Sequence, residues 1–370
     1  MKYYVIAGEA SGDLHGANLM RALREKDPAA EFRFWGGDAM AAIGGAPVRH
    51  IRDLAIMGFV EVLVHLRTVM GNIAFCKRDI EQWQPDAVVG IDYPGFNLKI
   101  EAWAHNHGIK TIHYISPNLW AWKKGRIKGM RRTLDRLCYI LPFEEEFFAQ
   151  NDMPQAIYVG HPLFDAVANH QLNTEHLTPS TAKPVIALLP GSRRQELKNS
   201  LPQMVNLARR HPEYRFVVAA MSLLGESLYR KHIPADSNIE VVYDQTYSLL
   251  SQAHAAIVCS GTATLETALF NVPQVVCYKG NPISIAIAKA VVSKRIRYIS
   301  LVNLIADKPI VTELIQEDFN AERLEREFRL IADDGANRER MLAEYADMRT
   351  LLGNGGASMR AAQAIIDTVK

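Results

Sequence analysis

A carboxylate that directly follows an apolar run is the first candidate for chemistry in this sequence. Residues 87–91 (AVVGI) are apolar on both faces, as a buried strand is, and Asp92 follows them. A carboxylate there is costly unless it is capped, paired or used, and it can accept the proton of a sugar hydroxyl as a general base. The alternative is that Asp92 only orders the turn at Pro94 and Gly95. The position at a strand end favours the catalytic interpretation.

A glycine-containing segment, residues 8–13 (GEASGD), follows the first apolar run and precedes a helical pattern. Glycines permit a tight turn, and a helix N-terminus offers free N–H groups to an anion or a sugar hydroxyl. The glycines are four residues apart, so the segment does not match the Gly-x-Gly-x-x-Gly pattern of dinucleotide binding. Asp13 is either a helix N-cap or a ligand, and the sequence leaves both open.

Two segments of the second half are suited to binding a diphosphate. In residues 189–196 (LPGSRRQE), backbone N–H groups and the guanidinium of Arg193 can hold the phosphates, unless the segment is only a capped helix start with solvated arginines. In residues 260–266 (SGTATLE), the open helix start can stabilise a departing nucleotide diphosphate without a metal. Glu266 can accept both hydroxyls of a ribose, or it is a surface glutamate that favours the helix dipole.

Composition narrows the function classes. The chain has 48% hydrophobic and 22% charged residues, which excludes a disordered or fibrous protein, and its net charge of +2 does not indicate a nucleic-acid partner. No Asp-x-Asp, His-Glu-x-x-His or P-loop motif occurs, so we expect no metal and no cofactor. The scattered histidines, including His113 and His161, are interpreted as structural. The four cysteines form no zinc or redox pair and lie at Cys76, Cys138, Cys259 and Cys277.

Two segments favour contact with a membrane surface. Residues 54–75 are unusually apolar and are flanked by basic residues, and residues 120–122 (WAW) lead into the basic stretch 123–132. The alternatives, a buried core helix and a solvated basic helix, are equally compatible with the sequence. The N-terminal apolar stretch is too short for a signal peptide and no run is long enough to span a bilayer, so we expect a cytoplasmic protein. The candidate membrane or acyl contacts are Met57, Phe59, Val60, Leu63, Trp120 and Trp122.

Alternating strands and helices must position these residues, as in βαβ units. Expected strands in the first half are residues 3–7, 32–35, 87–91, 111–115, 137–141 and 157–159, and in the second half 185–189, 215–219, 240–242, 255–258 and 275–278. Helical spacing covers residues 14–24, 100–107, 144–150, 321–348 and 357–368. A polar stretch, 165–184, reads as a linker. We therefore expect an α/β protein with two Rossmann-like domains, residues 1–170 and 184–345, and a cleft between them. We expect the C-terminal helices, including residues 346–370, to pack back on the first domain.

Six segments occur in the order of a known family and cover nearly the whole chain: residues 8–13, 57–62 (MGFVEV), 90–97 (GIDYPGFN), 114–122 (YISPNLWAW), 189–193 and 260–266. Together they strongly resemble lipid-A-disaccharide synthase. The resemblance implies a GT-B fold and an inverting glycosyl transfer without metal. It also implies an enzyme on the cytoplasmic face of the inner membrane of Gram-negative bacteria, and leaves a homodimer open.

The resemblance also implies the substrates. The donor is UDP-2,3-diacylglucosamine, the acceptor is 2,3-diacylglucosamine 1-phosphate, and the products are the β-1′,6-linked disaccharide 1-phosphate and UDP. By position, Asp92 is the candidate base for the acceptor 6-hydroxyl, and Glu9 is a second catalytic candidate. The implied substrate and UDP contacts are Ser11, Gly191, Ser192, Arg193, Arg194, Ser260, Gly261, Thr262, Ala263, Glu266 and Asn303.

Three positions depart from the family pattern: Gly95 stands where aspartate is frequent, Val302 where proline is frequent, and Arg194 where a small residue is common. Three other interpretations stay open. A sugar-nucleotide 2-epimerase would use the same UDP pocket without needing an acyl surface. The second is a transferase that builds the peptidoglycan lipid intermediate. The third is a catalytically silent nucleotide-binding adaptor at the membrane.

Overall fold

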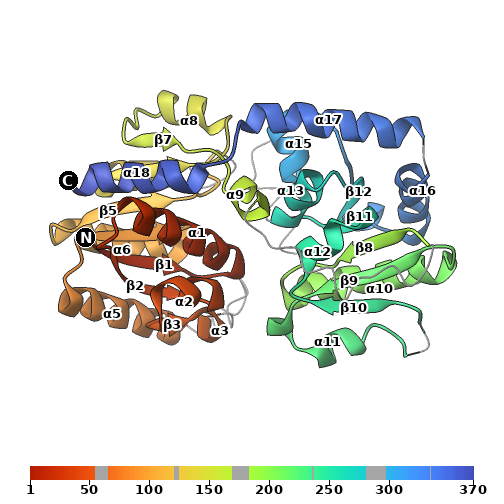
Figure 1. Ribbon diagram of the computed structural model, residues 1–370, viewed down its shortest axis with the longest axis horizontal. Helices are drawn as coiled ribbons and strands as arrows, with labels where there is room; N and C mark the ends of the chain where they lie inside the picture. The colour runs from red at the N-terminus through yellow and green to blue at the C-terminus, as the bar shows by residue number, and fades with distance from the viewer. Residues whose placement is uncertain (55–65, 121–124, 169–182, 236, 281–296, 334) are drawn as a thin grey trace. The chain divides into compact units, whose positions relative to one another are not determined.

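The computed structural model describes residues 1–54, 66–120, 125–168, 183–235, 237–280, 297–333 and 335–370. The chain forms two compact units, one made of Met1–Ala166 with Asn354–Lys370 and one made of Val167–Gly353 (Figure 1). No helix in these described ranges is both long enough and apolar enough to cross a membrane. Each unit is a parallel sheet with helices, as the alternating pattern predicts.

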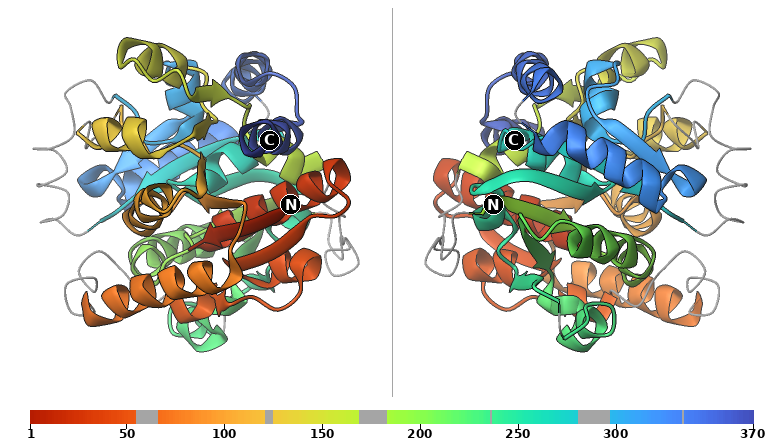
Figure 2. Two further views of the ribbon diagram at one scale, coloured as in Figure 1. Left: turned by 90° about the vertical axis from the view of Figure 1, so that its left-hand side faces the viewer. Right: turned by 90° about the vertical axis from the view of Figure 1, so that its right-hand side faces the viewer.

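The first unit is built on a seven-stranded parallel sheet of order β3-β2-β1-β4-β5-β6-β7. Its strands are β1 (Lys2–Ala7), β2 (Glu31–Gly36), β3 (Arg49–His50), β4 (Ala87–Ile91), β5 (Lys110–Tyr114), β6 (Arg136–Tyr139) and β7 (Ala156–Tyr158). Its helices are α1 (Ala10–Lys26), α2 (Asp38–Gly44), α3 (Ile51–Leu54), α5 (Leu66–Trp83), α6 (Pro94–Asn106), α7 (Arg126–Thr133), α8 (Glu144–Gln150) and α18 (Ala357–Val369), with α9 (Leu163–Ala168) at the boundary between the units. Figure 2 shows helices on both sides of this sheet.

The core of the first unit explains why β4 is apolar throughout. The strand lies between β1 and β5, and all five of its residues are buried. On one face, Tyr4 and Trp35 pack with Cys76 and Ile80 of α5 and with Ile100 of α6. Central strands of parallel sheets are covered on both faces, so they need an unbroken apolar run rather than alternation.

The second unit has a six-stranded parallel sheet of order β10-β9-β8-β11-β12-β13. The strands are β8 (Val185–Leu189), β9 (Arg215–Ala220), β10 (Glu240–Tyr243), β11 (Ala253–Cys259), β12 (Gln274–Tyr278) and β13 (Thr312–Ile315). The helices are α10 (Arg194–Arg210), α11 (Glu226–Arg230), α12 (Thr246–Leu250), α13 (Thr262–Leu269), α15 (Leu301–Ala306), α16 (Ala321–Ala332) and α17 (Ala336–Leu352), with short 3₁₀ turns at Ser222–Leu224 and Gln316–Asp318.

The expected strands are confirmed, each to within two residues at either end. The sequence did not predict β3, which has only two residues, or β13, whose four residues carry little apolar pattern. The helix expected over residues 321–348 is two helices, α16 and α17. Both belong to the second unit, so the expectation that the C-terminal helices pack on the first domain is correct only for α18.

The chain returns to the first unit at Asn354 rather than at residue 346, because α17 continues to Leu352. Asp165 of α9 accepts hydrogen bonds from the backbone N–H groups of Gly356 (2.5 Å) and Ser358 (2.7 Å) and so caps α18. Arg360 donates to the carbonyl oxygens of Val159 and of residues 354 and 355. These contacts fix the last helix to the first unit.

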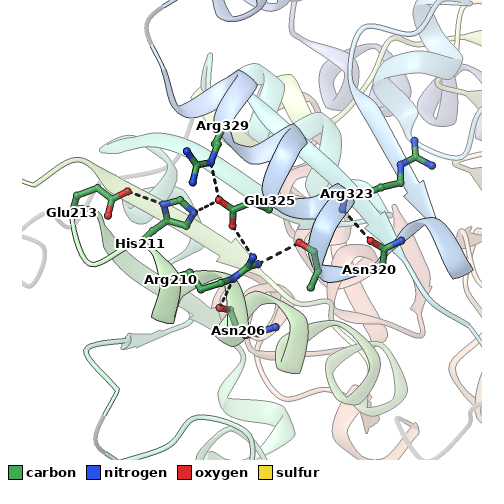
Figure 3. A network of polar contacts seen from close by, with 9 residues as sticks. Asn206, Arg210, His211, Glu213, Asn320, Arg323, Glu325 and Arg329 are labelled. Carbon is green, nitrogen blue, oxygen red and sulfur yellow. Dashed lines mark hydrogen bonds and ion pairs between the residues drawn. The ribbon is translucent and has the colours of Figure 1, made fainter.

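A polar network joins α10 to α16 in the second unit (Figure 3). The ring of His211 is almost fully buried, and its nitrogens lie 2.7 Å from Glu213 Oε1 and 2.8 Å from Glu325 Oε1. Arg210 and Arg329 also bind the Glu325 carboxylate. Two carboxylates only accept, so both bonds form together only with the protonated imidazole ring.

We predict that Glu325→Gln destabilises the second unit by about 1 kcal/mol near neutral pH, because a charge-assisted bond to a buried ring is lost. The hydrogen bond from His211 lowers the pKa of Glu213. Burial raises the pKa of Glu325, but the bonds from Arg329 and His211 bring it below its ordinary 4.5. Carboxylates with a lowered folded pKa stabilise above their ordinary pKa and lose that contribution as the pH falls through the folded value.

The difference in unfolding free energy between wild type and variant should therefore shrink as the pH falls through the lowered folded pKa of Glu325, where this carboxylate becomes protonated. Urea unfolding, followed by circular dichroism at neutral and acidic pH, measures the free energy of unfolding of both proteins. An equal difference at both pH values would contradict the assignment.

Candidate functional site

The candidate residues lie where the strand order of each sheet reverses. In the first unit this switch point is between β1 and β4, which pair Ala7 with Ile91, so the β1–α1 turn and Asp92 leave the sheet side by side. In the second unit it is between β8 and β11, which pair Leu189 with Val258. Open α/β sheets bind ligands at this point, outside the carboxyl ends of the strands. Each unit thus carries its motifs at the expected edge.

The backbone at Asp92 is held in an unusual conformation. Asp92 and Tyr93 have φ values of 45° and 47°, which is left-handed backbone that non-glycine residues seldom adopt. The buried Asn97 amide stabilises it, since Nδ2 donates to the carbonyl oxygens of Ile6 (3.2 Å), Ile91 (3.3 Å) and Asp92 (2.8 Å). The Asp92 side chain itself is exposed at the end of a fixed strand. The Asn97 amide therefore ties this turn to the ends of the two strands.

Gly8 and Tyr93 bring the two turns of the first unit into contact. A Cβ atom on Gly8 would lie 2.5 Å from two ring carbons of Tyr93, and Tyr93 stacks on Phe96 at 5.7 Å. Burial raises the pKa of the Tyr93 phenol, and the charge of Glu9 raises it further. The exposed Glu9 is therefore within electrostatic reach of the residue next to Asp92. The structure brings the two catalytic candidates to one edge of one sheet.

Asp13 belongs to a neighbouring helix start rather than to a ligand site. Its carboxylate accepts hydrogen bonds from the backbone N–H groups of Gly37 (2.7 Å), Ala39 (3.0 Å) and Met40 (3.0 Å). These are the first N–H groups of α2, which a helix leaves without internal partners. Neither alternative from the sequence is correct, because Asp13 caps α2 and not its own helix. Ser11 lies half-buried in the first turn of α1.

At the start of α10 the structure corrects one expectation. The backbone N–H groups of Ser192 and Arg193 donate to Glu196 Oε2 at 3.1 Å and 3.2 Å, so a carboxylate of the chain already occupies them. Gly191 has φ 110°, and a Cβ there would lie 2.6 Å from Glu196 Cβ. The Arg193 guanidinium lies 3.7 Å from Glu196 Oε1 and is 63% exposed, and Arg194 is also exposed.

The start of α13 is exposed in the part of the chain that the structure describes. Gly261 and Thr262 are exposed, and the first N–H groups of a helix have no partner inside it. Ser260 is held in place, because its Oγ donates a hydrogen bond to the carbonyl oxygen of Ile299 (3.1 Å). Ala263 is half-buried in the first turn. This helix start fits an anion such as a diphosphate.

Glu266 is held by a residue that no sequence motif marks. Tyr247 of α12 is nearly buried, and its hydroxyl donates to Glu266 Oε1 at 2.8 Å. Burial raises the pKa of Glu266, and the bond from Tyr247 acts against this rise. The carboxylate is thus fixed one turn into α13.

Asn303 is engaged inside the protein. It is buried, its Nδ2 donates to Val311 O (2.9 Å) and Glu313 Oε1 (3.0 Å), and its Oδ1 accepts from Val311 N (2.9 Å). The Glu313 carboxylate also accepts from the backbone of Ile299 and from Ser300. In this structure Asn303 therefore supports the loop that anchors Ser260, and it does not present its amide to a ligand.

The membrane candidates Met57, Phe59, Val60, Leu63 and Trp122 lie outside the described residues. Trp120 is half-buried, packs edge-on against Phe143 at 5.0 Å and has a buried indole nitrogen. In α5, Ile73 is buried in the core while Met70 is 54% exposed. The described part of the apolar run thus packs Ile73 on the core and leaves Met70 at the surface.

Metal ligands do not gather in the part of the chain that the structure describes: no three His, Cys, Asp or Glu side chains are arranged to hold an ion. The four cysteines are free thiols, and all of them are buried. Burial raises the pKa of Cys76, Cys138 and Cys259 to about 12, so these thiols are protonated and unreactive.

Solved structures with the same architecture identify the fold. A UDP-GlcNAc 2-epimerase from Neisseria meningitidis matches with a TM-score of 0.69 and 14% identity, over 99% of this chain and 100% of that one. The glycotransferase of kitacinnamycin matches with a TM-score of 0.66 and 17% identity, over 99% and 98%. Two Rossmann-like units of this kind define the GT-B fold class.

Sequence similarity identifies the family. The family model described as lipid-A-disaccharide synthetase matches residues 3–366. Lipid-A-disaccharide synthases of Geobacter metallireducens and Chromohalobacter salexigens are 36% and 38% identical, over 98% and 99% of this chain and 96% of each relative. The chain belongs to the lipid-A-disaccharide synthetase family. It is a glycosyltransferase of lipid A biosynthesis, as the resemblance of its motifs predicts.

We predict that Gly8→Ala lowers turnover about a hundredfold, because its methyl group would displace the Tyr93 ring and with it the Asp92 backbone. The strain should cost about 1 to 3 kcal/mol of stability. The matched control is Gly95→Ala, where a Cβ meets nothing within 4 Å. Turnover and thermal unfolding of both variants test this, and equal turnover in the two would contradict the close packing.

Proposed function

We propose that the protein transfers the sugar of UDP-2,3-diacylglucosamine to the 6-hydroxyl of 2,3-diacylglucosamine 1-phosphate, forming a β-1′,6 linkage and releasing UDP. The observation that carries this proposal is the exposed Asp92 carboxylate on a strand end whose backbone is fixed by Asn97. Family membership supports the reaction class. A rigid base next to an open edge is what an incoming hydroxyl needs.

In the proposed step, Asp92 takes the proton of the acceptor 6-hydroxyl as that oxygen bonds to the anomeric carbon of the donor. The bond from that carbon to the diphosphate oxygen breaks on the opposite face, and UDP leaves with the electron pair. The configuration inverts, and no metal is required if the protein stabilises the diphosphate charge. Glu9, beside Tyr93, is the second acidic group that orients the acceptor.

The second unit would bind the UDP. The exposed guanidinium groups of Arg193 and Arg194 and the open start of α13 stabilise the two phosphates. Glu266, held by Tyr247, accepts the hydroxyls of the ribose. The reaction requires both units to act on one pair of substrates.

We also propose that the protein works at the cytoplasmic face of the inner membrane, since both substrates carry acyl chains. Support comes from α7, where Lys128, Arg131 and Arg132 are exposed. Such side chains attract anionic lipid headgroups. The proposed membrane or acyl contacts are Met57, Phe59, Val60, Leu63, Trp120 and Trp122.

We predict that Asp92→Asn retains UDP binding and loses turnover by about a hundredfold to ten-thousandfold, the contribution of a positioned general base. The amide has nearly the same shape but does not accept the proton. Disaccharide 1-phosphate is detected by mass spectrometry and UDP affinity by calorimetry, with both diacylated substrates in detergent.

Product from the wild type and none from the variant supports the proposal. Turnover of the variant at the wild-type rate would remove Asp92 as base. Turnover of UDP-N-acetylglucosamine without an acylated acceptor would instead favour an epimerase.

We predict that Tyr247→Phe weakens UDP binding about fivefold, because one hydrogen bond to a half-buried carboxylate is worth about 1 kcal/mol. The loss should shrink with 2′,3′-dideoxyuridine diphosphate, which has no ribose hydroxyls for Glu266. The control is Tyr243→Phe, a tyrosine of the same unit that packs against Tyr229. Equal losses for UDP and the dideoxy nucleotide would refute the ribose assignment.

A further inference from the structure

A buried pair of ionisable side chains lies in the first unit. His113 of β5 and Glu101 of α6 are both 0% exposed, and His113 Nδ1 lies 2.7 Å from Glu101 Oε1. In the described part of the chain, the second ring nitrogen and the second carboxylate oxygen have no hydrogen-bond partner. Burying such a pair gains little stability, because the loss of hydration offsets the attraction. A contribution to stability therefore does not explain why this pair is buried here.

The backbone is adapted to hold this pair next to the Asp92 loop. Gly90 of β4 is the register partner of His113 in β5. A Cβ atom on Gly90 would lie 2.1 Å from Glu101 Oε1 and 2.9 Å from Asn97 Cβ. A side chain at this position would exclude the carboxylate, so the glycine provides its space. Gly90 is two residues before Asp92, and the pair thus sits at the strand end that carries the proposed base.

We propose that His113, kept protonated by Glu101, is a positioning residue that keeps Asp92 ionised while the phosphorylated substrates are bound. The inference rests on the proposed function of Asp92. The donor carries a diphosphate and the acceptor a phosphate, and negative charge nearby raises the pKa of a carboxyl. A buried imidazolium opposes this effect and is screened by solvent and salt less than a surface cation, and the Glu101 carboxylate that holds its proton offsets part of its field.

The charges around the imidazole agree with this role. Burial lowers the pKa of His113, but Glu101 and then Asp92 raise it above its ordinary value. Glu101 acts from α6 and Asp92 from the end of β4, so both neighbours favour the imidazolium. The influence is mutual, so the imidazolium in turn favours the ionised form of Asp92.

Other ionisable groups face the neighbouring residues of these elements. Glu9 acts on Tyr93 from the β1–α1 turn. Asp165 and Arg360 act on Tyr114, the residue after His113 in β5. These groups are present in every variant described below, so their effects on the pH profile cancel when the variants are compared.

The test is the pH dependence of kcat/KM in Glu101→Gln, in which the side chain keeps its shape and an acceptor for Nδ1 but no longer stabilises the imidazolium. Asp92 must be ionised to act, so loss of the cation raises its pKa and moves the acid limb to higher pH. We expect a shift of about one pH unit, with about tenfold lower activity on that limb and little change at high pH. His113→Gln should shift the limb in the same direction.

The matched control is Asp79→Asn, which breaks an ion pair in the same unit. Asp79 is buried, and it binds the guanidinium of Arg33 and the hydroxyl of Tyr4. This variant should lose stability and keep the wild-type pH profile. If Glu101→Gln and His113→Gln also lose stability without moving the acid limb, the pair is structural and the proposal is overturned.

A second measurement does not depend on activity. In NMR spectra of histidine-labelled protein, the His113 ring should titrate at lower pH in Asp92→Asn than in the wild type, because one neighbouring anion is gone. An unchanged titration would overturn the coupling. If the wild type makes no disaccharide from the diacylated substrates, the proposed function fails, while this titration still decides whether His113 and Asp92 interact.

Discussion

The side-chain amide of Asn97 is the contact on which the first unit's site depends. Its Nδ2 group joins the carbonyl oxygens at the ends of β1 and β4, including that of Asp92 itself. Strand ends otherwise diverge into separate turns, and the left-handed backbone at Asp92 and Tyr93 is unfavourable without such a tie. With the amide in place, Tyr93 packs over Gly8 and the acidic residues share one edge. Rigidity here comes from one buried polar group.

Helix starts show how the fold separates structural from functional anion sites. Asp13 occupies the start of α2, Glu196 that of α10 and Asp165 that of α18. Each carboxylate supplies the negative charge that a helix N-terminus favours, so these starts are used by the chain itself. At α13, Thr264 Oγ1 donates to the Gly261 carbonyl oxygen, and the first residues are exposed. The α13 start is therefore better suited than the α10 start to a diphosphate.

The strands could be predicted from the sequence because buried parallel strands are apolar throughout, and the motifs could be placed because each follows such a strand. Contacts between residues that are distant in sequence could not be predicted in this way. Tyr247 contributes to the site only because α12 lies next to Glu266. Asn303 is a candidate ligand residue in the sequence, but in the fold its amide is hydrogen-bonded to Val311 and Glu313. A single sequence gives the type of a polar residue, while its partners decide whether it is free to bind a ligand.

The GT-B fold alone does not choose between transfer and epimerisation, since an epimerase and a glycosyltransferase match it about equally well at low identity. The charges at the first unit's switch point bear on the chemistry. Glu9 and Asp92 are acidic, and a transferase of phosphorylated sugars adds more negative charge to the same edge. A nearby cation favours the ionised, proton-accepting form of a carboxylate at such an edge. His113 can supply that charge from within the sheet, where it occupies none of the space that the acceptor needs.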